Sequence, residues 1–286
     1  MVKKFFRKIF KKKEESEITD EEYIEYVNKA KEHCKRGDVF QLVLSRRYTQ
    51  KFKGDEFNVY RALRSINPSP YLFFFDYGDF KIFGSSPEAQ IVIKDGKSEI
   101  HPIAGTFKRT GNDEEDQKTA KELAEDPKEN SEHIMLVDLA RNDLSRSGYN
   151  VKIEKNREVQ FYSHVIHLVS KVTSILKDNI KPFQVVEDTF PAGTLSGAPK
   201  HRALELIEKY EKVNRNFYGG ALGYIDFNGN FNHAIIIRSF FSKNNILNYQ
   251  AGAGIVIDSI PEKELEEVKN KLGALDKALE EAEKIK

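Results

Sequence analysis

The sequence has very little cysteine and almost no net charge. Cys34 is the only cysteine among 286 residues, so the chain cannot form an internal disulfide. The formal net charge is +1, which gives no reason to expect a nucleic-acid partner. The sequence also lacks a secretory signal pattern and an apolar run of membrane-spanning length. Together these absences favour a protein of the reducing cytoplasm, without firm membrane association.

The residues that are present suit an ordinary globular fold. Hydrophobic residues make up 39% of the chain and charged residues 32%, which is enough to build a large core under a solvated surface. At this length we predict one large domain over residues 17–286. Residues 1–16 differ, because basic and apolar side chains alternate there at helical spacing. This leader could lie on an anionic membrane or pack on protein. One short helix binds membranes weakly, so we favour packing.

Alternating apolar and polar residues joined by tight turns predict antiparallel sheet. Asp95-Gly96 and Asn228-Gly229 are typical of two-residue hairpin turns. Gln41 is a polar residue on a mostly apolar strand surface. The strands are predicted at residues 39–48, 71–76, 80–84, 89–94, 99–103, 223–227, 231–241 and 246–251. Runs of strands separated from runs of helices indicate an α+β fold.

A helix is predicted from Asp126, an N-cap residue followed by a first-turn proline, to about Arg141. Glu132 lies on the same face as Leu136 and Leu139, which are four and seven residues further along. The charged stretch at 112–125 is interpreted as a loop leading into a solvated helix. Glu132 is therefore turned toward the interior, where its charge has to be neutralised.

The last helix is predicted from Pro261 and has an apolar stripe of leucine and valine at three-four spacing. Glu264, Glu267 and Lys271 form a second line beside that stripe. For an isolated helix, the simple interpretation is an exposed salt bridge between Glu267 and Lys271. The alternative is that these side chains belong to a binding site.

Two glycine-rich segments favour the alternative. Residues 250–256 place two glycines within a strand, where close approach of a ligand or backbone is the usual reason. Residues 193–200 feed a helix predicted to begin near Pro199, whose first N–H groups would attract an anionic oxygen. With Arg238 on the strand between them, the two segments describe a site for a small molecule with two carboxylates.

These segments, read in order, show a family resemblance. The motifs at 102–106, 131–143, 193–200, 218–220 and 250–254 resemble those of the chorismate-utilising enzymes, most of all the large components of anthranilate synthases. The resemblance runs from about residue 17 to the C-terminus. It implies an α/β sandwich of antiparallel sheets that lacks the usual N-terminal portion of the family.

The resemblance implies Mg²⁺ as cofactor, with Glu132 and Glu267 as ligands and Glu264 holding the ion through water. It implies that Tyr218 and Arg238 bind the enolpyruvyl carboxylate of chorismate, with Lys271 near the metal-bound ring carboxylate. The implied cradle for substrate and product consists of Gly105, Thr106, Gly252, Ala253 and Gly254.

The resemblance also implies catalytic roles. Glu88 matches the acid that protonates the departing C4 hydroxyl, which requires burial and a raised pKa. His167 matches the histidine associated with pyruvate elimination, although a lone histidine in an apolar strand is more often a core residue. Thr194 lines the same pocket.

Two positions favour ammonia as the nucleophile. Related aminodeoxychorismate synthases typically have a nucleophilic lysine where this chain has Ala104, and isochorismate and salicylate synthases have a water-activating lysine where it has Gln41. The resemblance therefore implies conversion of chorismate and ammonia to anthranilate and pyruvate, the first step of tryptophan biosynthesis. The alternatives are aminodeoxychorismate-type amination and a non-catalytic chorismate-binding or scaffold protein.

The main departure from the family lies at the front of the chain. The large components usually have some hundred and fifty or more further N-terminal residues, including the pocket for feedback by tryptophan. We therefore expect this chain to lack tryptophan inhibition and to leave sheet edges bare. No glutamine amidotransferase domain is present, so use of glutamine would require a partner amidotransferase subunit.

Overall fold

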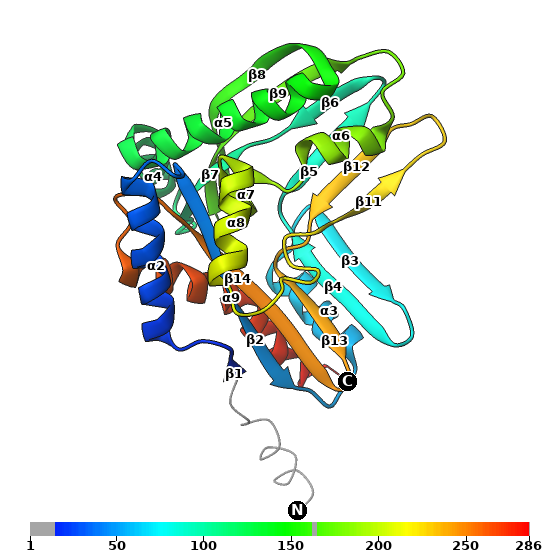
Figure 1. The fold of residues 1–286 in the computed structure, drawn as a ribbon. Coiled ribbons are helices and arrows are strands. Elements are labelled where there is room, and N and C mark those ends of the chain that lie inside the picture. The colour runs from blue at the N-terminus through cyan, green and yellow to red at the C-terminus, as the bar shows by residue number, and fades with distance from the viewer. Residues whose placement is uncertain (1–14, 162–164, 286) are drawn as a thin grey trace, which may run out of the picture. The chain divides into compact units, whose positions relative to one another are not determined.

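The structure is a computed structural model that describes residues 15–161 and 165–285 (Figure 1). All but the last two residues of the predicted leader, 1–16, lie outside the described residues. The chain divides into two compact units. Unit 1 contains described residues up to 87, with 195–220 and residues from 236 onward. Unit 2 contains residues 88–194 and 221–235.

Unit 1 is built on a sheet in which the described strands all pair in antiparallel fashion. Its long central pair is β2 with β14, whose register runs from Lys51 opposite Ile246 to Leu42 opposite Ile255. In spatial order the strands are β1 (Glu15–Ser16), β2 (Gln41–Lys51), β14 (Ile246–Ile255), β13 (Ser239–Lys243), β4 (Phe80–Ser86) and β3 (Tyr71–Asp76), with β10 (Gly197–Ala198) also paired to β2.

Four described helices of unit 1 pack with this sheet through a common core of buried apolar side chains (Figure 1). The helices are α2 (Asp20–Lys35), α3 (Glu56–Ile66), α8 (Lys200–Tyr210) and α9 (Pro261–Ala282). Thr19 and Glu22 form a reciprocal capping box that fixes the start of α2. The predicted stripe of α9 is confirmed, because Leu265, Val268 and Leu272 are all buried. Burial of this face holds α9 against the core.

Unit 2 has its own antiparallel sheet. In spatial order the strands are β11 (Ala221–Ile225), β12 (Phe231–Ile235), β5 (Ala89–Lys94), β6 (Lys97–Ile100), β9 (Val165–Leu176) and β7 (Ile103–Lys108), with β8 (Gly148–Phe161) also paired to β9. Its helices are α4 (Asp113–Glu125), α5 (Pro127–Ser147), α6 (Pro182–Thr189) and the short α7 (Gly193–Ser196), which crosses the unit boundary. Antiparallel pairing was predicted for both sheets and is confirmed.

Several element boundaries differ from the sequence prediction. Asn112 caps α4 directly, so the predicted loop is already helical from Asp113. Asp126 caps α5 as predicted, but the helix continues six residues beyond Arg141 to Ser147. Within the described residues, no helix combines the length and apolar character needed to cross a bilayer.

The predicted strand at 231–241 is wrong as a single element. It consists of β12 and β13, separated by residues 236–238, and the two strands belong to different sheets. Arg238 adopts a left-handed φ of 49° at this break. A left-handed residue cannot continue a strand, so the continuous apolar pattern concealed the change of sheet.

Candidate functional site

The predicted site residues are distributed over both units. Unit 1 holds Gln41, Tyr218, Arg238, Gly252, Ala253, Gly254, Glu264, Glu267 and Lys271. Unit 2 holds Glu88, Ala104, Gly105, Thr106, Glu132, His167 and Thr194.

The glycine segment of β14 lies close against β2. Gly252 pairs with Ser45 and Gly254 pairs with Val43 in a regular antiparallel ladder. A Cβ added to Gly252 would lie 2.8 Å from the carbonyl oxygen of Leu44. Neighbouring backbone therefore excludes any side chain at Gly252, and this explains a glycine within a strand.

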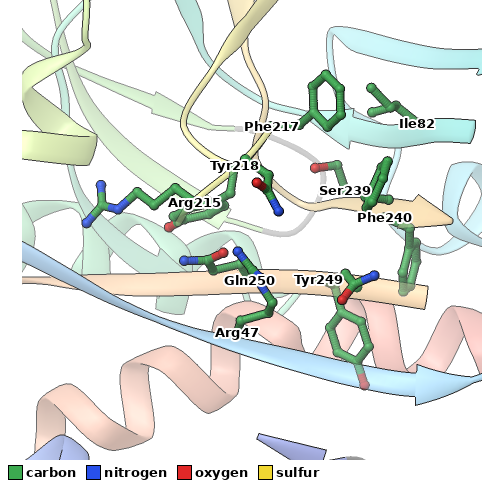
Figure 2. A pocket seen from close by; sticks show the side chains of 12 residues that line it. Arg47, Ile82, Arg215, Phe217, Tyr218, Ser239, Phe240, Tyr249 and Gln250 are labelled. Atoms are coloured by element: carbon green, nitrogen blue, oxygen red, sulfur yellow. The ribbon is translucent and has the colours of Figure 1, made fainter. Parts of the chain in front are cut away.

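Tyr218 interacts with this glycine segment. Its N–H donates to the carbonyl oxygen of Arg215 at 2.9 Å. Burial raises the pKa of Tyr218 above its ordinary value, although the Arg215 guanidinium and the backbone of Gly252, which both act on the phenol, lower it. The phenol is therefore held neutral and can act as a hydrogen-bond donor. Tyr218 and Gln250 both border a cavity of unit 1 (Figure 2).

Helix α9 supplies a cation to the same segment. The Lys271 ammonium donates to the carbonyl oxygen of Gly252 at 2.9 Å and lies 2.7 Å from Glu267 Oε1. The i,i+4 salt bridge expected for an isolated helix is therefore present, and its lysine also reaches the glycine segment. Glu264 is only 3% exposed, whereas the Glu267 side chain is 46% exposed. The two carboxylates thus face different surroundings on one helix.

Tyr23 is a neighbour of this site that sequence reasoning missed. Its hydroxyl donates to the carbonyl oxygen of Leu44 at 3.0 Å. Burial, followed by the nearby Glu267 and Glu264 carboxylates, raises the pKa of Tyr23 well above its ordinary value, although the backbone of Ala253 lowers it slightly. In the sequence this tyrosine belongs to the apolar face of a helix, and nothing in that pattern marks it as a contact of the glycine segment.

Gln41 is buried at the start of β2, with 2% of its surface exposed. The segment predicted to feed the next helix passes directly beside it, because Ala198 pairs with Gln41 and Gly197 with Leu42. Gly197 has a φ of 126°, and an added Cβ would lie 2.2 Å from the Gln41 carbonyl oxygen. Glycine is therefore required where this segment crosses β2.

In unit 2, the predicted motif at 102–106 forms a β-bulge. Ala104 pairs with Leu168 and Phe107 with Ile166, so Gly105 and Thr106 together stand opposite His167. Gly105 has a left-handed φ of 67°. The bulge aims its carbonyl oxygen at His167 Nδ1, 2.7 Å away. Because a carbonyl only accepts, neutral His167 carries its proton on Nδ1 and has its acceptor lone pair on Nε2.

Glu88 and Thr194 are directly connected. Glu88 lies between β4 and β5, and its Oε1 accepts a hydrogen bond from Thr194 Oγ1 at 2.9 Å. The backbone carbonyl of Glu88 accepts from the Ile235 N–H at 3.0 Å. The predicted acid is thus fixed by both its backbone and its side chain.

Glu132 lies half-buried on α5, as its place on the inner face predicted. The neighbouring His133 is fully buried, with its Nε2 2.6 Å from Ser170 Oγ on β9. Burial lowers the pKa of His133 to about 4, so this ring is neutral. A further carboxylate, Glu129, was not predicted. Its Oε2 would lie 3.0 Å from a Cβ added to Gly105, which places it beside the bulge.

Carboxylates dominate the predicted metal ligands of both units, and this donor set suits Mg²⁺. In the part of the chain that the structure describes, no three His, Cys, Asp or Glu side chains form a ready-made metal cage. Magnesium does not need one, because it is usually held by one or two carboxylates and completes its shell with water and substrate. The ligand set Glu132, Glu264 and Glu267 stays a prediction.

Comparison with known proteins identifies the family. The family model described as chorismate binding enzyme matches residues 2–277. Anthranilate synthase component 1 of Aquifex aeolicus is 48% identical over 270 residues, which cover 94% of this chain and 55% of the relative. The Bacillus subtilis protein of the same name is also 48% identical, covering 90% of this chain and 50% of the relative. This chain therefore spans about half the length of these curated relatives.

Solved structures agree with this family and confirm the implied fold. The crystal structure of anthranilate synthase component I from Streptococcus pneumoniae aligns with a TM-score of 0.86 at 40% identity, covering 92% of this chain and 59% of that one. A putative 2,3-dihydroxybenzoate-specific isochorismate synthase from Bacillus anthracis aligns with a TM-score of 0.84 at 29% identity, covering 94% of this chain and 74% of that one. The α+β fold with antiparallel sheets, predicted from the resemblance, is that of these structures, and the chain belongs to the chorismate binding enzyme family.

Proposed function

We propose that this protein converts chorismate and ammonia to anthranilate and pyruvate with the help of Mg²⁺. The observation that supports this activity best is the hydrogen bond from Thr194 to Glu88 Oε1. This bond fixes the rotation of the Glu88 carboxyl group, and Glu88 is the residue proposed to act as the general acid. The names of the curated relatives from Aquifex aeolicus and Bacillus subtilis support the same reaction.

In the first step, ammonia forms a bond to C2 of the ring, both ring double bonds shift, and the C4–O bond breaks. The new ammonium group then loses one proton to solvent and becomes an amine. Glu88 transfers its proton to the departing oxygen, so that water leaves instead of hydroxide. Such proton transfer requires the acid and the oxygen to be within hydrogen-bond reach. Thr194 is a positioning residue in this scheme because it fixes the rotation of the Glu88 carboxyl group.

In the second step, a base removes the C2 proton and the C3–O bond breaks. Enolpyruvate leaves with the bonding electrons and becomes pyruvate after protonation, while the ring becomes aromatic. His167 is suited to accept this proton because its Nδ1 proton is directed to the Gly105 carbonyl oxygen. That hydrogen bond selects the tautomer whose Nε2 is basic.

The remaining proposed residues bind the substrate. Tyr218, as a neutral phenol, and Arg238 hold the enolpyruvyl carboxylate. Lys271 adds positive charge near the ring carboxylate while it binds the Gly252 carbonyl oxygen. The cradle residues are Ala104, Gly105, Thr106, Gly252, Ala253 and Gly254, with Gln41 placed beside the nucleophile.

Glu132 and Glu267 are proposed to hold Mg²⁺, with Glu264 acting through water. When bound, this ion supplies positive charge that fixes the ring carboxylate of chorismate. The 46% exposure of the Glu267 side chain is compatible with a ligand that must still be reached by solvent and substrate. Nitrogen is proposed to enter as free ammonia, with a glutamine amidotransferase partner required for glutamine.

The proposal is tested by incubating the purified chain with chorismate, Mg²⁺ and ammonium while following anthranilate fluorescence. We expect fluorescence to rise with ammonium and to disappear when EDTA is added. Glutamine alone should give no product, and glutamine use without a partner would refute that part of the proposal. Formation of aminodeoxychorismate would assign the chain to the alternative amination. If the folded chain leaves chorismate unchanged with ammonium, the proposed activity is wrong for this chain.

A further inference from the structure

A buried ion pair lies at the end of α8 in unit 1. Glu211 caps the C-terminus of this helix, and Arg215 follows four residues later. Arg215 Nε donates to Glu211 Oε2 at 2.8 Å and its Nη2 donates to Oε1 at 2.6 Å. The Arg215 side chain is 17% exposed and the Glu211 side chain is 5% exposed. This paired geometry is the strongest arrangement of these two groups, and it fixes both side chains in orientation.

Arg215 also binds the backbone of two other segments. Its Nη2 donates to the carbonyl oxygen of Val43 on β2 at 2.8 Å. Its Nη1 donates to the carbonyl oxygen of Leu195 at 2.5 Å, within the predicted segment 193–200. One planar guanidinium therefore ties β2 and this segment to Glu211. A lysine cannot reproduce these contacts, because its single ammonium has no forked geometry.

Glu211 binds β2 as well, from its other side. Its Oε1 accepts from the backbone N–H of Ser45 at 2.8 Å and from Ser45 Oγ at 2.7 Å. Ser45 Oγ in turn accepts from Gln250 Nε2 at 2.7 Å. Gln250 lies on β14, two residues before Gly252. The network thus continues from Arg215 to the strand that contains the glycine segment.

The strand register shows which residues of β14 lie opposite the backbone groups that the ion pair binds. Val43, bound by Arg215, is the partner of Gly254 in the β2–β14 ladder. Ser45, bound by Glu211, is the partner of Gly252. The ion pair therefore forms hydrogen bonds with β2 at Val43 and Ser45, the residues that pair with Gly254 and Gly252 of the proposed cradle.

Tyr218 is the third element in contact with the pair. Its backbone N–H binds the Arg215 carbonyl oxygen at 2.9 Å, and the guanidinium lies 5.9 Å from its ring centroid. Figure 2 shows Arg215 beside Tyr218 and Gln250 at one end of the cavity of unit 1. Each segment bound by Arg215 or Glu211 thus contains or faces a residue of the proposed substrate site.

We propose that the Glu211–Arg215 pair positions the carboxylate-binding part of the substrate site, and that both are positioning residues and not merely stabilising ones. The proposal rests on the proposed function. A buried ion pair is not needed for stability as such, because apolar pairs of similar size are often equally stabilising. An apolar pair could not replace the four hydrogen bonds that these two side chains form with three backbone atoms and the Ser45 hydroxyl.

The decisive variant is therefore Glu211→Leu combined with Arg215→Met, which fills the space without charge. We expect this double variant to fold with a lower melting temperature than the wild type, because the Val43 and Leu195 carbonyls and the Ser45 N–H lose their partners. Its KM for chorismate should rise about tenfold or more while kcat falls less, since misplacing a binding group by about 1 Å can cost up to ~100-fold. A folded double variant with unchanged KM would overturn the proposal.

Arg215→Lys is the second variant, in case the double variant does not fold. It keeps the charge and loses the fork, so KM should again rise. The matched control is Arg202→Lys on α8, where Arg202 pairs with Glu205 at 2.7 Å on the surface. This control should leave KM unchanged. An unchanged KM in folded Arg215→Lys, or an equal rise in the control, would count against a positioning role.

Amide hydrogen exchange separates this proposal from the proposed activity. In a folded variant of the pair, exchange should become at least severalfold faster around residues 250–254 and 195–198, with α9 unchanged. If the wild type makes no anthranilate but exchange changes in this way, the proposed function fails and the structural role of the pair stands. If exchange at these segments is unchanged, the positioning role is wrong whatever the activity.

Discussion

Two segments of this protein contain glycine within a strand at the proposed substrate cradle, and they need glycine for different reasons. Residues 252–254 of unit 1 lie in an uninterrupted ladder, where an added Cβ on Gly252 would meet the Leu44 carbonyl oxygen. Residues 104–106 of unit 2 form a bulge, where Gly105 is left-handed. The first glycine makes room for neighbouring backbone, and the second permits a backbone turn.

The two segments also differ in the side chains that surround them. The Lys271 ammonium donates to the unit 1 segment and the Tyr218 phenol is influenced by its backbone; both groups suit recognition of carboxylates. The unit 2 segment directs its carbonyl at an imidazole, and the same unit contains the Glu88–Thr194 pair. We therefore expect changes in unit 1 to act mainly on KM for chorismate and changes in unit 2 to act mainly on kcat.

The largest effect is expected for Glu88→Gln in unit 2. Removing a general acid should lower kcat by about 10²–10⁴-fold while KM changes little. Thr194→Val should lower kcat by up to about tenfold through loss of one hydrogen bond, whereas Thr194→Ser keeps the donor and should stay close to the wild type. Steady-state kinetics with anthranilate fluorescence measures all three. A rise in KM with constant kcat for Glu88→Gln would contradict the expectation that changes in unit 2 act mainly on kcat.

A pH effect on stability is expected from His233 of unit 2. Burial lowers the pKa of His233 to about 4, although a backbone contact with Ala221 opposes this. Unfolded histidine titrates near 6.5, so the unfolded chain takes up this proton first as the pH falls. Stability is therefore complete above pH 6.5 and should decline toward pH 4, by up to about 3 kcal/mol from this group.

Urea unfolding from pH 7 to pH 4 measures this loss. His233→Gln should flatten the decline, because the titrating group is gone. The control is His201→Gln in unit 1, whose side chain is 91% exposed and should leave the profile unchanged. Equal profiles for the wild type and His233→Gln would show that this histidine is not responsible.

Alanine at the two glycines should distinguish the two segments. Gly252→Ala should destabilise the fold by about 1–3 kcal/mol, because backbone cannot give way to the new methyl group. Gly105→Ala should cost about 1–2 kcal/mol for left-handed backbone, and the first atom that its Cβ meets is the flexible end of Leu123. Gly273→Ala in α9 is the control, since nothing lies within 4 Å of that Cβ.

That control should stabilise the protein by about 0.5–1 kcal/mol, because alanine is the better helix residue. Chemical unfolding gives the free energies, and kinetics adds the second test. We expect Gly252→Ala to raise KM and Gly105→Ala to lower kcat. The comparison between the units would be contradicted if both variants altered the same constant.

The smallest effect is expected for Lys271→Met in unit 1. The loss of one charge-assisted hydrogen bond from a partly exposed ammonium should raise KM by about tenfold. Lys269→Met, on the same helix, removes a lysine that pairs with Asp20 instead and should leave KM unchanged. Initial rates over a range of chorismate concentrations measure the effect. A decrease in kcat alone would place Lys271 outside substrate binding.

Much of the fold followed from local patterns in the sequence. The cap at Asp126 and the apolar stripe after Pro261 predicted α5 and α9, because helix starts and buried faces depend on nearby residues. Tight turns predicted the antiparallel pairing. The break at Arg238 was missed, because an uninterrupted apolar run conceals a single left-handed residue.

Site residues could be predicted from the sequence where the local backbone requires a particular residue type. They could not be predicted where their contacts are with distant segments. Gly252 and Gly105 could be found as glycines in strands, although the different reasons for them could not. Tyr23 resembles a core residue and Arg215 resembles a solvated charge after a helix. Their hydrogen bonds reach strands that are adjacent only after folding, so no local pattern identifies them.

The proposed function depends most on Glu132 and Glu267 as ligands of Mg²⁺. The most direct measurement is anomalous diffraction from crystals of the chain grown with Mn²⁺ in place of Mg²⁺ and with the substrate chorismate. We predict one metal peak with a carboxylate oxygen of each residue at a magnesium-like distance of about 2.1 Å. Separate peaks at the two carboxylates, or a peak that only one of them reaches, would contradict the account.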